Sequence, residues 1–354
     1  MRSRLFQSSA FAGTPGELRR GIEIALRRYV FTSAVVLAVF SVLVRPATAQ
    51  KYVGTIALPP GSDVYGSMAV DPQSGLLFLP SYDSGELLVA DTATDTVIDA
   101  ISSNRVISAV FDPANNLVYF TSFDGIEAID ATTGTFVADL TGVGLGIAAN
   151  PQTGLIYMTR GNTVWVIDPT VLPSGQVIDI IDLTAAGVFN AANVVVNPVT
   201  NFIYVAAEDG VAVIDGTTDQ VVTVLDSGTH SYIPTIAIDV ELNLIYAPGA
   251  GGVTIIDGQT NQVTTTIAAK GEGMGVAVDP VTHRVYVTND SYNGHGKDPN
   301  RQLLTIDGTA EAIVAKYPMP FYARSVVVNP ATGLVYLAER YGDIHVFEDV
   351  PAGQ

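Results

Sequence analysis

The sequence contains no cysteine, and this absence removes several kinds of protein at once. It excludes disulfide scaffolds, thiolate metal sites, cysteine nucleophiles and covalently attached c-type haem. Charged residues are also scarce, at 15% of the chain, and the 35 acidic residues outnumber the 17 basic ones, which gives a formal net charge of −18. This excess of acid argues against nucleic acid as a partner, because contacts to phosphate need a basic surface.

The chain has 354 residues, of which 48% are hydrophobic and 33 are glycine. It is therefore too apolar for a disordered chain, and long enough for one large domain or two ordinary ones.

The N-terminus has the pattern of an export signal. Residues 1–28 carry six arginines, residues 29–44 form an apolar run, and the small residues Ala47 and Ala49 precede Gln50. A positive region, an apolar stretch and an A-x-A site are typical of a secretory signal peptide. We therefore predict a signal over residues 1–49 and a secreted or periplasmic protein. The alternative is a transmembrane anchor, for which the run is short.

The pair Arg27-Arg28 loosely resembles a twin-arginine signal, so the export route stays open. Cleavage before Gln50 would remove seven basic and two acidic residues and leave a net charge of −23. We expect the mature chain, residues 50–354, to be a monomeric single domain with no membrane span.

A repeat of about 42 residues runs through the mature chain. Each repeat has an anchor, an Asp or Asn that nearly always precedes Pro: Asp71, Asp112, Asn150, Asn197, Asp239, Asp279 and Asn329. Four residues after each anchor stands a residue type that tolerates positive φ: Gly75, Asn116, Gly154, Asn201, Asn243, His283 and Gly333. Seven residues after each anchor stands an aromatic: Phe78, Tyr119, Tyr157, Tyr204, Tyr246, Tyr286 and Tyr336. The first two columns predict a tight hairpin turn, and the aromatics are predicted to fill the core.

A second acidic position follows later in each repeat: Asp91, Asp130, Asp168, Asp215, Asp257, Asp307 and Glu348. We expect these acids to cap turns by accepting backbone N–H bonds. Short β-rich runs lie between the turns, four to a repeat, and four strands per repeat describe one propeller blade. The sequence therefore predicts an all-β, seven-bladed β-propeller with four antiparallel strands per blade.

Several segments resemble the YVTN-repeat family of bacterial β-propellers, among them HRVYVTND, VAVIDGTTDQVV and VTIIDGQTNQVTTTI. The resemblance covers the whole mature chain and implies the fold, but it implies little about activity, because propellers carry many unrelated functions. The first strand of the mature chain, residues 52–58, matches the fourth strand of a repeat. We therefore expect this N-terminal strand to complete the last blade and close the ring.

In a propeller, the strands run outward from the axis, so the loops between blades share one face with the loops between each blade's second and third strands. We call this the recognition face. It collects seven of the ten basic residues expected in the mature chain and several aromatic ones. We predict a binding scaffold for a small anionic or hydroxyl-rich ligand, or for a peptide or protein. The central contacts are expected to be Arg105, Arg160, His230, Tyr232 and Arg324.

An enzyme is the alternative, since several propeller families of similar architecture are lactonases, lyases or quinone-linked dehydrogenases. A lactonase-like or lyase-like site would use a metal bound by loop carboxylates, with His230 or Tyr232 as general acid or base. Asp63, Asn193 and Glu272 are the nearest candidate ligands by position in the repeat. No catalytic residue is assigned, and His283 and His345 are expected to be structural.

No cofactor or metal site is predicted. In the long loop 289–302, Asp290, Asn293 and Asp298 offer oxygens to Ca²⁺, but they do not match a calcium-loop register, so we expect a polar surface loop.

Overall fold

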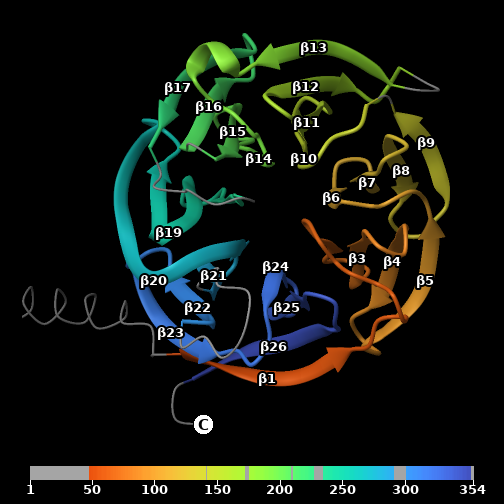
Figure 1. Cartoon of the computed structure of the whole chain (residues 1–354), viewed down its shortest axis with the longest axis vertical. Coiled ribbons are helices and arrows are strands. Elements are labelled where there is room, and N and C mark those ends of the chain that lie inside the picture. Colours follow the sequence, from red (N-terminus) through yellow and green to blue (C-terminus); the bar gives the residue numbers. More distant parts are fainter. Residues whose placement is uncertain are drawn as a thin grey trace, which may run out of the picture. The chain divides into compact units, whose positions relative to one another are not determined.

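A computed structural model describes residues 48–140, 142–171, 175–208, 210–226, 234–290 and 300–351. These residues form antiparallel sheets arranged in a ring around a central axis (Figure 1). The predicted signal up to residue 47 lies outside the described residues. No α-helix occurs in the described ranges, whose one helical element is the 3₁₀ turn Thr184–Ala186, ended by left-handed Gly187. Accordingly, no helix there is long and apolar enough to cross a membrane.

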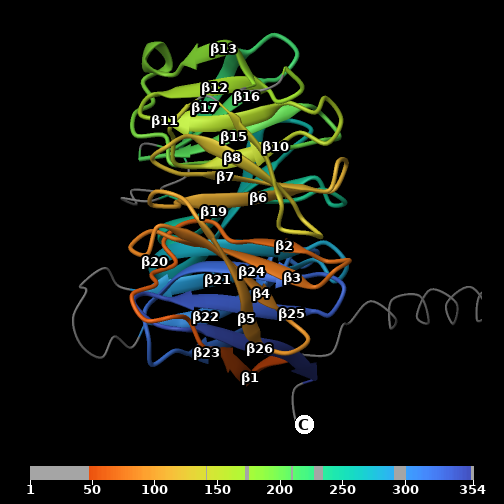
Figure 2. The ribbon, with the colours of Figure 1, turned by 90° about the vertical axis from the view of Figure 1, so that its right-hand side faces the viewer.

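Six sheets make up the ring, which Figure 2 shows from its edge. Four of them follow the chain with four strands each, from the axis outward. The first sheet contains β2 (Ala69–Asp71), β3 (Leu76–Ser81), β4 (Glu86–Asp91) and β5 (Thr96–Ser102), and the second contains β6 (Ser108–Asp112), β7 (Leu117–Thr121), β8 (Ile126–Asp130) and β9 (Phe136–Leu140). The third sheet contains β10 (Ile147–Ala149), β11 (Ile156–Arg160), β12 (Thr163–Asp168) and β13 (Gln176–Asp182). The fourth sheet contains β14 (Asn193–Val196), β15 (Phe202–Ala207), β16 (Gly210–Asp215) and β17 (Gln220–Leu225).

The fifth sheet has six strands, and the sixth sheet closes the ring. The six strands are β18 (Ala237–Asp239), β19 (Leu244–Asp257), β20 (Gln262–Asp279), β21 (Arg284–Asp290), β22 (Gln302–Asp307) and β23 (Ala312–Pro318). The closing sheet is made of β24 (Ala323–Asn329), β25 (Leu334–Glu339), β26 (Ile344–Pro351) and β1 (Thr48–Ile56).

The prediction of seven separate four-stranded blades is therefore wrong, because the structure has six blades. The fifth and sixth repeats share one sheet. In this sheet β19 and β20 are each continuous across a segment that the sequence predicts to be a loop between two strands. Glu272 is paired on both sides, with Ala250 of β19 and with Asp290 of β21, so hydrogen bonding runs unbroken from one repeat into the next.

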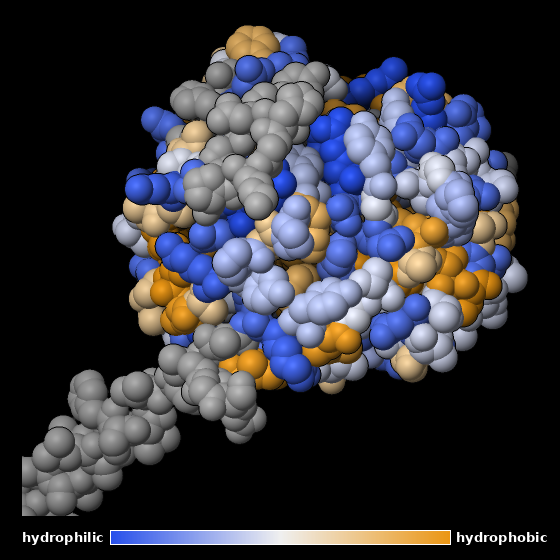
Figure 3. All heavy atoms as spheres, turned by 60° about the horizontal axis from the view of Figure 1, so that its bottom comes forward, coloured by the Kyte–Doolittle hydropathy of each residue, from blue (hydrophilic) through white to orange (hydrophobic). Residues whose placement is uncertain are grey.

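Apolar packing nevertheless follows the seven repeats. In the described part of the chain, seven clusters of buried side chains lie between consecutive repeats, and one of them lies within the six-stranded sheet. The seven aromatics of the third column are all buried in these clusters, as predicted. The outermost strands expose scattered apolar side chains, and Figure 3 shows small apolar patches separated by polar residues.

The anchor turns form as the sequence predicts. In all seven repeats, the side-chain oxygen of the anchor accepts the backbone N–H of the residue two positions later, at 2.9–3.1 Å. All seven anchors are buried, and all seven residues of the second column have φ between +56° and +74°. The turn thus satisfies a backbone donor where the innermost strand ends, and it needs a residue that accepts left-handed φ.

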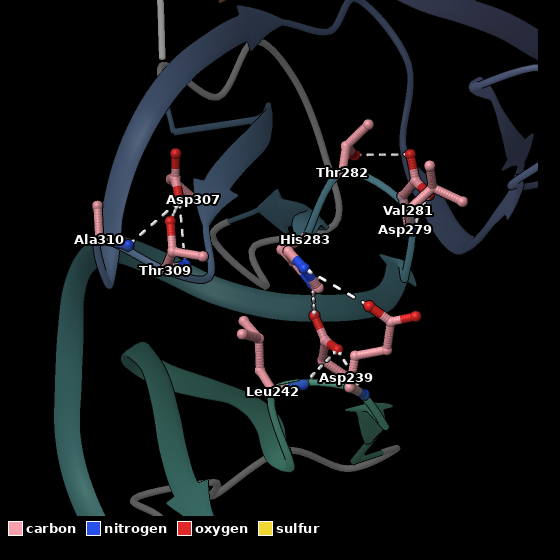
Figure 4. A network of polar contacts seen from close by, with 10 residues as sticks. Asp239, Leu242, Asp279, Val281, Thr282, His283, Asp307, Thr309 and Ala310 are labelled. Atoms are coloured by element: carbon pink, nitrogen blue, oxygen red, sulfur yellow. Dashed lines mark hydrogen bonds and ion pairs between the residues drawn. The ribbon is translucent and has the colours of Figure 1, made fainter. Parts of the chain in front are cut away.

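A second bond links some of these turns around the ring. Asn150 Nδ2 donates to Asn201 Oδ1 at 2.8 Å, and Asn197 Nδ2 donates to Asn243 Oδ1 at 2.6 Å. In the next repeat His283 Nδ1 lies 2.8 Å from Asp239 Oδ2, and Figure 4 shows the imidazole pointing at this carboxylate. In these three cases the left-handed residue of one repeat bonds the anchor of the previous repeat.

Glycine at the left-handed position removes this link. Asp112 Oδ2 and Asn329 Nδ2 are buried without a hydrogen-bond partner among the described residues. The next left-handed residues around the ring are Gly154 and Gly75, which have no side chain to offer. The structural role predicted for His283 is thus confirmed, because His283 supplies the link that glycine lacks.

Six of the seven second acids cap turns as expected. Each accepts the backbone N–H two residues later, at 2.8–3.0 Å. The exception is Glu348, which lies within β26 and pairs with Lys51 of β1 at 2.7 Å. The N-terminal strand is the outermost strand of the last sheet, so the predicted ring closure is confirmed, and Glu348 belongs to that closure.

We expect replacement of His283 by Ala to lower the free energy of unfolding by about 3 kcal/mol, because it removes a bond to a buried carboxylate and because Ala tolerates the left-handed φ of +56° less well than His. His283→Asn, the residue that stands in the two preceding repeats, should cost less than about 1 kcal/mol. His283→Gly separates the two effects, because it relieves the backbone but loses the bond. Urea denaturation measures all three, and equal stability of the Ala and Asn variants would contradict the link.

The buried tyrosines predict a loss of stability at high pH. Burial raises the pKa of Tyr157 and of Tyr336 to about 12. The folded state thus keeps both phenols protonated, whereas in the unfolded chain they ionise above pH 10. Their contribution to the free energy of unfolding is therefore fully present below pH 10 and is lost between pH 10 and 12. The loss is at most about 1.4 kcal/mol per tyrosine and pH unit.

Denaturation at pH 9, 10 and 11 should show this fall, and it should be shallower in the double variant Tyr157→Phe/Tyr336→Phe. An identical slope in the two proteins would refute the assignment to these phenols.

Candidate functional site

The innermost strands enclose a cavity of about 810 Å³ on the ring axis. Its walls come from all seven repeats. The first repeat contributes the residues just before β2, and the others contribute β6, β10, β14, β18, the second half of β20 and β24, with residues just before several of them. Because each innermost strand ends at an anchor, the wall residues form rings that can be counted back from the anchors. The anchor turns therefore fix the position along the ring axis of each side chain in the cavity wall.

The ring four residues before the anchors is polar and small: Ser67, Ser108, Gly146, Asn193, Thr235, Gly275 and Ser325. We call it the collar. Asn193 Nδ2 donates to Ser67 Oγ at 3.0 Å, and Thr235 Oγ1 donates to the carbonyl of Met274 at 3.2 Å. A Cβ on Gly146 or Gly275 would lie 2.5 Å from the carbonyl oxygen of the next repeat's strand, so glycine permits the close approach of strands there.

The rings three, two and one residues before the anchors are aliphatic apart from a single Phe. Lining residues in these rings include Met68, Ile147, Val195, Ala237, Val276 and Val327. A polar collar thus stands at the recognition face, and an apolar barrel lies beneath it.

Arg324 stands one residue above the collar, at the start of β24, and lines the cavity. Its guanidinium carbon lies over the ring of Tyr65 at 4.6 Å and over that of Tyr322 at 5.7 Å. Its Nε and Nη1 are buried without a hydrogen-bond partner among the described residues. Burial by itself would lower the pKa of Arg324, but the neighbouring Tyr322 and Tyr65 outweigh it and raise the pKa, so the group stays charged.

Aromatic rings and guanidinium groups continue from Arg324 across the recognition face. The contacts join seven residues, here called the arginine–aromatic ladder: Arg301, Tyr322, Arg324, Tyr65, Tyr82, Arg105 and Phe123. Ring centroids along it are 5.7 and 5.9 Å apart, and Arg105 lies 5.3 Å from both Tyr82 and Phe123. Such contacts hold a guanidinium group in place through its faces and leave its N–H edge available.

The arginines of the ladder differ in their charge partners. Arg301 Nε donates to Asp290 Oδ2 at 2.8 Å. Arg105 and Arg324 form no ion pair with any carboxylate in the described part of the chain. Glu208, the other charged residue in the described part of the cavity lining, accepts a hydrogen bond from Asn190 Nδ2 at 2.6 Å. On so acidic a protein, Arg324 is thus a cavity cation that lacks a counter-ion within the described ranges.

The structure brings two of the five predicted contacts, Arg105 and Arg324, into one ladder. Arg160 lies elsewhere, over Trp165 at 4.8 Å, and does not line the cavity. This separation argues against one shared site. His230 and Tyr232 lie outside the described residues.

The candidate metal ligands do not converge. Asn193 lines the cavity, whereas Asp63 and Glu272 do not, and Asp63 Oδ1 accepts the backbone N–H of Tyr341. Among the described residues, no group of three or more His, Asp or Glu side chains is placed to hold a metal ion. Of the loop oxygens, Asp290 pairs with Arg301, and Asn293 and Asp298 lie outside the described ranges.

His345 is a packed strand residue, as predicted: it stacks on Phe321 at 3.7 Å and lies 2.8 Å from Glu339 Oε2.

Sequence reasoning missed Tyr65, Tyr82 and Tyr322 as partners of the arginines, although it placed all three in recognition-face loops. It also missed the collar. The collar could be found by aligning the sequence on its seven anchors. Four positions before them, five of the seven residues are Ser, Thr or Asn and the other two are Gly.

Comparison of the chain with protein-family models and with curated proteins found no match. The assignment of a site therefore depends on the geometry of this chain alone.

Proposed function

We propose that the protein is an exported, monomeric β-propeller of the YVTN-repeat type that binds an anionic ligand on its recognition face, at the mouth of the axial cavity. Arg324 is the central contact, Tyr65 and Tyr322 hold it in position, and Arg105 adds positive charge along the ladder. The observation that carries the proposal is the position of Arg324, a half-buried cation that lines the cavity, forms no ion pair within the described ranges and has two buried nitrogens without a described partner.

Leaving the Arg324 cation without a counter-ion in this position is destabilising. A buried charge is destabilising unless it is paired and hydrogen-bonded. The cation–π contacts of the guanidinium group with tyrosine rings offset part of this cost, by about 0.5–2 kcal/mol per contact. A carboxylate or phosphate in the cavity would pair the charge of Arg324 with short, charge-assisted bonds, which are about twice as strong as neutral ones.

Export and anion binding are separate parts of the proposal. When the full chain is expressed with its own leader in a bacterial host, we expect a periplasmic or secreted product that begins at Gln50. Mass spectrometry of the product tests this: a chain that keeps residues 1–49 and stays with the membrane would favour the anchor alternative.

Anion binding is tested with acetate, phosphate and citrate, by calorimetry at low salt. We expect at least one of them to bind the wild type, and Arg324→Gln to weaken it at least tenfold, because the substitution removes the charge but keeps much of the side chain's size. Arg160→Gln is the matched control, since Arg160 is an arginine of the same face that lies outside the cavity. Equal losses in the two variants, or none in Arg324→Gln, would refute the site.

A further inference from the structure

We propose that the ligand is an amphiphile, with one anionic head group bound at Arg324 and one unbranched aliphatic chain inside the axial cavity. The inference rests on the proposed function and specifies the ligand's chemical class. It follows from the order of the layers along the axis: a cation, then the polar collar, then the aliphatic rings.

Most polar side chains of the collar already form hydrogen bonds within the protein, which leaves few of them for a hydroxyl-rich ligand to bind. Asn193 bonds Ser67 across the repeats, and the hydroxyl of Thr235 is bonded to a main-chain carbonyl. The carbonyl of Ser67 in turn accepts the backbone N–H of Ala109 at 2.8 Å. A sugar that passed below the collar would leave its hydroxyl groups facing aliphatic side chains, at a cost for each unpaired group.

The barrel below the collar suits methylene groups. Its lining side chains include Met68, Ile147, Val195, Val276 and Val327, and below the collar no charged residue of the described ranges lines the cavity. A volume of about 810 Å³ falls in the range of small-molecule sites, which are mostly apolar with a few polar groups that fix orientation. An aliphatic chain there leaves water and covers apolar surface, which is favourable in proportion to its length.

The charges limit the head group to one end of the ligand. Among the residues that the structure describes, Arg324 and Glu208 are the charged residues of the lining, and Glu208 is bonded by Asn190 at the mouth. A ligand with a second charge at its far end would bury that charge among aliphatic side chains. The site therefore selects a monocarboxylate or a monoalkyl phosphate over a dicarboxylate of the same length.

Chain-length dependence tests the inference on the whole protein. We expect the Kd for hexanoate, octanoate and decanoate, measured by calorimetry below their micelle concentrations, to fall about fourfold per added methylene, which corresponds to about 0.8 kcal/mol. Decyl phosphate should bind as decanoate does, whereas decanol and decanedioate should bind at least tenfold more weakly. If all chain lengths bind equally and still require Arg324, the amphiphile is refuted and the anion site stands. If decanoate binds equally to the Arg324→Gln variant, both proposals fail.

A cavity-filling variant locates the chain. Ala237 lines the cavity and is partly exposed to it, so Ala237→Phe should weaken decanoate binding at least tenfold and leave acetate or phosphate binding unchanged. The matched control is Ala100→Phe, on the exposed outermost strand β5. Should Ala237→Phe fail to fold, Ala149→Leu on β10 makes a smaller change in the same barrel. Decanoate binding that survives in a folded cavity variant would overturn the placement of the chain.

Discussion

The bond between each anchor side chain and the backbone N–H two residues later is the constraint on which this structure depends. It gives a buried anchor side chain and a backbone N–H of the turn a partner at the end of the innermost strand, and it fixes where that strand stops. Because the same bond occurs in all seven repeats, the innermost strands end in equivalent positions around the axis. The rings of the cavity wall follow from this equivalence, and so do the collar and the height of Arg324 above it.

The local parts of the fold could be predicted from sequence because they depend on contacts within a few residues. The anchor, the left-handed residue and the buried aromatic are set by turn chemistry and strand alternation, and all three columns are confirmed. The closure by the N-terminal strand was also predictable, since residues 52–58 match the pattern of a fourth strand. Glu348 shows the limit: its column indicated a turn cap, but β1 places Lys51 beside it, and an ion pair forms.

The blade count and the site depend on contacts that no local pattern describes. Six sheets result because Glu272 pairs with strands on both sides, which joins two repeats whose turn residues look like all the others. The arginine–aromatic ladder forms because ring closure brings Tyr65 of the first repeat beside Arg324 of the last. Sequence alone placed both in recognition-face loops, but it did not predict that they would stack. Arg160 is the converse case, since a neighbouring Trp165 on its own sheet holds it apart.

The central claim is that a charged head group lies on Arg324 with an aliphatic chain below it. A crystal structure of the protein grown with decanoate tests this claim most directly. The account predicts density on the axis, with the carboxylate within 3 Å or so of the Arg324 guanidinium nitrogens and the chain among Val195, Val276 and Val327. It would be contradicted by a cavity that holds only ordered water while Arg324 Nε and Nη1 bond to groups of the protein itself.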